Sequence, residues 1–120
     1  METIHIQEQL SQFHGTESYH RHFLANKVSI LLTDGAEFIR EKGQCNWLFD
    51  FIVAYQTHKD IKNQRFQVWT LQKANMAWEL TCEDGNHNHL YTRRIEFSDF
   101  PLEKIIVWFV DGVAMLPSEY

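Results

Sequence analysis

The chain is poor in the residues that mark special classes of protein. Two prolines and five glycines among 120 residues, with 44% apolar residues, exclude a collagen-like or Pro/Gly-rich disordered chain and are typical of a folded globule. Two cysteines, Cys45 and Cys82, are too few for a disulfide framework, and we expect both to be free thiols. The longest apolar run, Ile105 to Val110, is far too short to span a bilayer.

Positive charge is also scarce. The net charge is −5, and it is spread evenly, since residues 1–60 carry 8 acids and 5 bases and residues 61–120 carry 8 acids and 6 bases. The absence of a basic stripe argues against binding to nucleic acid or to an anionic membrane. The first residues, Met1 to His5, lack the basic start and apolar run of a signal peptide. We therefore expect a cytoplasmic protein that binds neither nucleic acid nor membrane.

The second half of the chain contains a series of strand patterns. Residues 66–116 are typical of a series of consecutive β-strands, broken by turns at Asn75, at residues 84–88, at residues 99–101 and at Asp111-Gly112. The first half contains helical patterns over residues 3–13, 34–42 and 45–58, and one strand pattern at Val28, Ile30 and Leu32. Thr16 is expected to cap a short turn that carries Tyr19 and Phe23. The helix over residues 45–58 is apolar nearly all round, which predicts that it is enclosed or contacts another subunit.

These patterns predict one domain over residues 1–120 with an α+β fold. The N-terminal helices should pack on an antiparallel sheet of four or five strands, which the C-terminal meander forms. A turn at Ala74-Asn75 would place Leu71 opposite Trp78. Pairing Trp78 with Ile95 avoids a slip that would place Arg94 opposite Trp78. This register predicts an inward face made of Trp69, Leu71, Met76, Trp78, Leu80, Cys82, Tyr91, Arg93, Ile95 and Phe97, with Met76 opposite Phe97.

Arg93 is the one charged residue on this apolar face. An inward guanidinium is unfavourable unless it is paired, and Asp50 lies at the edge of the main apolar face of the helix over residues 45–58. We hypothesise a partly buried Asp50–Arg93 pair. One structural alternative is that the two side chains form an ion pair that only stabilises the fold. The other is that Arg93 extends past the edge of the sheet, so that its guanidinium reaches solvent. The functional alternative is an anion or carboxylate site built on the guanidinium fork of Arg93.

Histidine and cysteine give weaker candidates. His20 and His22, and likewise His87 and His89, have the His-x-His spacing, but both pairs fall in predicted loops, where the spacing fixes no geometry. No third ligand follows from spacing, and no HExxH or CxxC motif is present. Cys45 is near a predicted helix start, yet no base is specified for it. We predict no metal and no cofactor.

Apolar residues also occur on the outer face of the predicted meander. Phe66 and Val68 lie there, and the last hairpin pairs Trp108 with Met115 on one face and Phe109 with Ala114 on the other. The first helix, the C-terminal tail or a second subunit could cover them. The alternatives are a sheet edge covered by its own chain and an interface, formed by Phe66, Val68, Trp108 and Phe109, for a protein partner or a second copy.

Several short segments spread along the chain are distinctive, namely Gly15-Thr16-Glu17, Thr33-Asp34-Gly35, Trp47-Leu48 with Asp50, Tyr55-Gln56, Gln67-Val68-Trp69, Thr81-Cys82-Glu83-Asp84-Gly85, Asp99-Phe100-Pro101, Asp111-Gly112-Val113 and Leu116-Pro117-Ser118-Glu119-Tyr120. Through these segments, nearly the whole chain resembles a family of short bacterial, phage and plasmid proteins classed as a domain of unknown function. The ending is the most specific part of this resemblance. The resemblance implies no activity, cofactor or catalytic residue.

The leading prediction is a small intracellular binding or interaction module, and an accessory protein of a mobile element is one form that it could take. One alternative is a small enzyme with a pocket between helix and sheet that uses Asp50 and Arg93, with Tyr19 and His22 as further binding residues. A second alternative is an acidic inhibitor of a host defence protein, which no particular residue supports.

Overall fold

A computed structural model describes residues 2–24 and 28–120, with side chains from Ile6 onward in these ranges. The helices are α1 (Glu2–Leu10), α2 (Asp34–Lys42) and α3 (Asn46–Tyr55), followed near the end by the 3-10 helix η1 (Pro117–Glu119). The strands are β1 (His20–Phe23), β2 (Ser29–Leu32), β3 (Phe66–Ala74), β4 (Ala77–Asp84), β5 (His89–Ile95), β6 (Lys104–Val110) and β7 (Val113–Met115). None of the helices in the described ranges has the length and apolar character needed to cross a membrane.

The described strands form one sheet with the order β1-β2-β7-β6-β3-β4-β5. The α+β class is confirmed, but the prediction of four or five antiparallel strands is wrong, because the sheet has seven strands and is mixed. β2 pairs with β7 in parallel through Leu31–Val113 and Leu32–Ala114, whereas the other pairings are antiparallel. The short strand β7 thus joins the N-terminal β1–β2 hairpin to the C-terminal strands.

The strand β1 replaces the turn that was expected around Tyr19 and Phe23. Its residues alternate, so that His22 is buried among the helices while Arg21 and Phe23 are exposed on the other side of the sheet. The prediction that His20 and His22 lie in a loop is therefore wrong. His89 likewise begins β5, whereas His87 is in the hairpin loop. In β1, polar residues occupy the inward positions because carboxylates on the helices meet them there.

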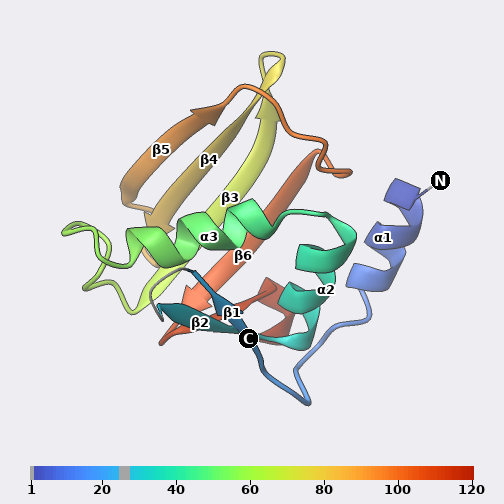
Figure 1. Cartoon of the computed structure of the whole chain (residues 1–120), viewed down its shortest axis with the longest axis horizontal. Helices are drawn as coiled ribbons and strands as arrows, with labels where there is room; N and C mark the ends of the chain where they lie inside the picture. The colour runs from blue at the N-terminus through green and yellow to red at the C-terminus, as the bar shows by residue number, and fades with distance from the viewer. Residues whose placement is uncertain (1, 25–27) are drawn as a thin grey trace.

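Helices α2 and α3 lie on one face of the sheet, and α1 lies beside α2 (Figure 1). The prediction that α3 is enclosed, which was based on apolar residues on nearly all of its sides, is confirmed. Four of its residues are buried, namely Leu48, Phe49, Ile52 and Val53. They pack with inward residues of the strands, among them Trp69, Leu71 and Val107. No helix of the described chain lies across the opposite face of the sheet, which we call the outer face (Figure 1).

The registers of two hairpins were predicted correctly. Trp78 pairs with Ile95 and Leu80 with Arg93 between β4 and β5, and Trp108 pairs with Met115 between β6 and β7.

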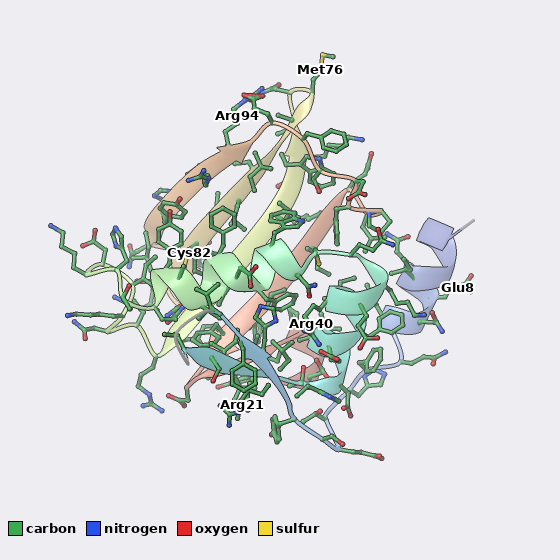
Figure 2. The ribbon with its side chains drawn as sticks, in the orientation of Figure 1. Glu8, Arg21, Arg40, Met76, Cys82 and Arg94 are labelled. Atoms are coloured by element: carbon green, nitrogen blue, oxygen red, sulfur yellow. The ribbon has the colours of Figure 1, made fainter. Side chains whose placement is uncertain are left out.

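The β3–β4 register is shifted by two residues from the prediction, so that Leu71 pairs with Leu80. Its turn is at Asn75 and Met76, whose φ angles are +51° and +65°. A shift of two residues keeps every side chain on its predicted face. The Met76–Phe97 contact is wrong, because these side chains are 99% and 82% exposed and Met76 points outward from the hairpin tip (Figure 2).

Candidate functional site

The N-terminus of α2 brings together segments that are far apart in the sequence. Thr33 is the N-cap, and its Oγ1 accepts a hydrogen bond from the backbone N–H of Ala36 at 3.2 Å. The backbone N–H of Asp34 donates to Oγ1 of Thr16 at 2.8 Å. In return, the backbone N–H of Glu17 donates to Oδ2 of Asp34 at 3.0 Å.

Glu119, near the C-terminus, completes this junction. Its Oε2 accepts from the backbone N–H of Gly35 at 2.9 Å, and its Oε1 accepts from the hydroxyl of Thr33 at 2.6 Å and the backbone N–H of Leu116 at 2.9 Å. A carboxylate is favourable there because the helix N-terminus carries partial positive charge. The backbone donors of Asp34, Gly35 and Ala36 all have partners inside the chain, so the junction is structural.

A second polar network joins β1 to the helices. Nε2 of His22 lies 2.8 Å from Oδ1 of Asp50, and Nδ1 of His22 lies 3.2 Å from a terminal nitrogen of Arg40. Because a guanidinium can only donate, Nδ1 accepts and the ring proton is on Nε2, which donates to Asp50. Arg40 in turn pairs with Glu37. Both nitrogens of His22 are therefore occupied, which leaves neither free to act as a general base.

The hypothesised Asp50–Arg93 pair is not present. Asp50 pairs with His22, and no acid in the described ranges forms an ion pair with Arg93. Arg93 is on the inward face, as its register predicts, but its side chain is exposed because β5 is the last strand of the sheet. Its guanidinium carbon lies 5.2 Å from the ring centroid of Phe51 on α3. The cation is thus placed by an aromatic ring rather than by a carboxylate.

Two tyrosines lie beside Arg93. The hydroxyls of Tyr55 on α3 and Tyr91 on β5 are 2.5 Å apart, and their ring centroids are 4.3 Å apart. Hydrogen bonding with Tyr91, and less strongly with Tyr55, raises the pKa of Arg93 above its ordinary value. Burial, followed by the hydrogen bond with Tyr55, raises the pKa of Tyr91, so that the phenol of Tyr91 stays protonated at neutral pH. We call Phe51, Tyr55, Tyr91 and Arg93 the arginine–tyrosine cluster.

Of the four predicted binding residues, only Asp50 and His22 contact each other. Tyr19 is 59% exposed, and it precedes His20, whose Nε2 lies 2.9 Å from Oδ1 of Asp34. This hydrogen bond with His20 is the main reason that the pKa of Asp34 is lowered. His20 and His22 therefore each bind a carboxylate from a different helix. Within the described ranges, no group of three His, Cys, Asp or Glu side chains could hold a metal ion.

The cysteines are packing residues. Cys45 and Cys82 are both buried and free, and burial raises the pKa of each thiol to about 12. Their thiolate fractions at neutral pH are therefore very small, which argues against a nucleophilic role.

A buried network of hydrogen-bonded amide side chains was not predicted from the sequence. Oε1 of Gln67 accepts from Nε1 of Trp69 at 2.9 Å and from Nε2 of Gln56 at 2.8 Å, and Nε2 of Gln67 donates to the carbonyls of Ile61 and Gln64. A glutamine at an inward strand position, two residues before Trp69, was the available signal. The network is fully satisfied and structural.

The outer face carries an apolar band on four adjacent strands. The band consists of Leu31 on β2, Val113 and Met115 on β7, Ile106, Trp108 and Val110 on β6, and Phe66 and Val68 on β3. All eight side chains are half-buried by their neighbours on the same face. The predicted interface residues Phe66, Val68 and Trp108 belong to this band. Phe109 does not, because it faces the helices and is buried in the core.

The C-terminal residue covers part of the apolar band. The ring centroid of Tyr120 lies 5.6 Å from that of Phe66 and 5.5 Å from that of Trp108, which are themselves 5.0 Å apart. Tyr120 is nevertheless 74% exposed. The C-terminal tail, one of the predicted covers, thus reaches only the Phe66–Trp108 region of the apolar band.

Two surface hollows lie away from Asp50 and Arg93. One, of about 370 Å³, is next to β2 and contains Arg65 and Asp111, which pair with each other at 2.9 Å. The other, of about 510 Å³, lies between the end of α1, β6 and η1. Neither hollow contains Asp50 or Arg93, so neither is the helix–sheet pocket expected for an enzyme.

Comparison with known proteins gives a family but no activity. The model of a family of unknown function, DUF6876, matches residues 4–120. No curated protein and no solved structure matches the chain. The match includes the three segments that meet at the N-terminus of α2 and the ending from Leu116 to Tyr120. The chain therefore belongs to DUF6876, a family of unknown function.

Proposed function

We propose that the chain is a non-enzymatic interaction module that pairs with a second copy of itself through the outer face of its sheet. The observation that carries this proposal is the apolar band. Antiparallel sheets with one solvated face usually show polar residues on that face, whereas here eight apolar side chains lie on four adjacent strands with no helix across them. Contiguous apolar surfaces of this kind are typical of protein interfaces.

The charges beside the apolar band favour a second copy as the occupant. Arg21 on β1 lies on one side of the apolar band, and Glu79 and Glu83 on β4 lie on the other. The midline of the apolar band falls between β7 and β6. A two-fold axis along the strands at this midline places β1 of one copy over β4 of the other, so that arginine faces glutamate twice. Sheets packed in this way lie about 10 Å apart.

The first test is the association state of the full chain by sedimentation velocity. We expect a reversible dimer. Replacing Val68 or Trp108 by glutamate should raise the dimer dissociation constant by a factor of about 30 or more, because each substitution would bury a charge near the centre of the interface. Thr92→Glu is the matched control, because it adds the same charge to the outer face on β5, outside the apolar band. Far-UV circular dichroism checks that each variant is folded.

Charge reversal tests the orientation. Arg21→Glu should weaken the dimer, and adding Glu83→Arg to that variant should restore part of the affinity. A monomeric wild-type protein at the highest soluble concentration would refute the dimer. A dimer that is insensitive to both Val68→Glu and Trp108→Glu would refute the outer face as its interface.

A further inference from the structure

We propose that the arginine–tyrosine cluster is a binding site for a carboxylate or phosphate group carried on an apolar or aromatic body. The cluster is on the inward side of β5, next to α3, and so on the opposite side of the sheet from the apolar band. The proposal is therefore independent of self-association.

The guanidinium of Arg93 is positioned but not neutralised. Its carbon lies 5.2 Å from the ring centroid of Phe51, and this contact with the ring uses none of the five N–H donors. In the described part of the chain no acid forms an ion pair with Arg93. Arg94, the next residue, differs in this respect because its Nε lies 3.1 Å from Oε1 of Glu96. Arg93 therefore offers a planar fork that can bind two oxygens of one anion.

The tyrosines add a neutral donor to this cation. When Tyr55 and Tyr91 share a hydrogen bond at 2.5 Å, one phenol is the donor and the other keeps its own proton free to donate. The free proton and the guanidinium lie in one cluster, since Tyr91 and Arg93 are two residues apart on the same face of β5 and Phe51, which contacts Arg93, stacks on Tyr55. An oxyanion placed there would accept from both residue types, whereas a metal cation would be repelled by Arg93.

The aromatic residues along α3 indicate what carries the anion. Trp47, Phe51 and Tyr55 follow each other on one side of the helix, with ring centroids 6.3 Å apart for Trp47 and Phe51 and 6.1 Å apart for Phe51 and Tyr55. All three are half-buried. An apolar or aromatic group attached to the anion would contact these rings, and we therefore expect such ligands to bind more tightly than a bare inorganic anion.

The test is an amide NMR titration of the full-length protein with phenyl phosphate, benzoate and inorganic phosphate. We expect saturable shifts at Phe51, Tyr55, Tyr91 and Arg93, with inorganic phosphate the weakest of the three probes. Comparison of phenyl phosphate with benzoate separates the phosphate from the carboxylate as the preferred group.

Substitutions on β5 supply the specificity control. Arg93→Gln should weaken binding at least about tenfold, and Arg93→Lys should also weaken it because lysine lacks the planar fork. Arg94→Gln makes the same charge change one residue away on the other face, and it should leave affinity within about twofold. Tyr91→Phe should weaken binding severalfold, and Val68→Glu should leave it unchanged.

Three results would overturn the proposal. The first is the absence of saturable shifts with all three probes. The second is equal weakening by Arg93→Gln and Arg94→Gln, which would show attraction to positive charge in general. The third is a set of saturable shifts centred on residues outside the cluster.

Discussion

Gly35 lies in the first turn of α2, where an alanine would ordinarily be more stable. Alanine is favoured over glycine inside a helix by about 1 kcal/mol. Here, however, a Cβ on residue 35 would lie 2.5 Å from Oε1 of Glu119 and 2.7 Å from Cδ1 of Leu116. The absence of a side chain at Gly35 is what lets the Glu119 carboxylate reach the helix N-terminus. The usual preference is therefore expected to reverse.

We predict that Gly35→Ala lowers the free energy of unfolding by about 1–3 kcal/mol, the range for overpacking a filled site. Urea unfolding monitored by tryptophan fluorescence measures this directly. Glu119→Ala should also lower stability, by about 1–2 kcal/mol, because it removes the acceptor for three donors.

The double variant tests the mechanism. Because the clash involves Glu119, Gly35→Ala should be less destabilising in the Glu119→Ala background than in the wild type. Effects that add to within about 0.5 kcal/mol would show that the two residues do not interact.

The residue least well predicted was Arg93. Its face was correct, because the period of two along a strand fixes the direction of a side chain. Its burial and its partner were wrong, because a strand pattern does not reveal which strand ends the sheet. The His22–Asp50 contact was missed for a related reason, since its two residues are on separate elements whose packing no local pattern specifies.

At the scale of elements, the β4–β5 hairpin is held by one carboxylate. Asp84 accepts from the backbone N–H groups of Asn86 and Asn88, at 2.8 and 2.9 Å, and from the side-chain amide of Asn88 at 2.9 Å. These hydrogen bonds, with the side chain of Asn88 contributing most, lower the pKa of Asp84 below its ordinary value of 3.8. The ionised carboxylate is thus favoured in the folded state.

A pH dependence follows from this lowered pKa. The stabilisation is present above the ordinary pKa of 3.8 and is lost as the pH falls through the lower pKa of the folded state. We predict that the wild type is more stable than Asp84→Asn at neutral pH and that this difference shrinks in acid. Urea unfolding of both proteins across a pH series gives the comparison. A difference that stays constant from neutral to acidic pH would contradict the role of the charge.

The elements were predictable where hydrophobic alternation was strong. The β4–β5 and β6–β7 registers followed from the fit of apolar partners and from the Asp111-Gly112 turn. β1 was missed because its sequence, His-Arg-His-Phe, has polar residues at the inward positions. Its strand character depends on pairing with β2 and on carboxylates from α2 and α3, none of which is local.

At the scale of the whole molecule, the two halves of the chain share one sheet. β2 pairs with β7, and Glu119 binds the start of α2. Neither half of the chain completes the core by itself, since the core includes Ile30 and Leu32 from the first half and Val107 and Ala114 from the second. The parallel β2–β7 pairing could not be predicted, because it involves few residues and joins distant parts of the sequence.

We predict a single cooperative unfolding transition. Far-UV circular dichroism and tryptophan fluorescence, measured on the same urea series, should give the same midpoint and the same slope. The physical reason is that loss of either half exposes apolar residues of the other. Two separated transitions would show that the helical half and the meander unfold independently, contrary to the shared sheet.

The strand β5 ends the sheet with seven residues whose outer edge has no partner strand in the described chain. Free edges of this length are where sheets of different molecules join and extend into fibrils. Arg93 and Arg94 are adjacent on β5 and their side chains lie on opposite faces. Two copies joined edge to edge would bring four guanidinium groups close together on both faces. The two arginines thus oppose edge-to-edge joining through β5, and the dimer proposed above would form through the face of the sheet instead of this edge.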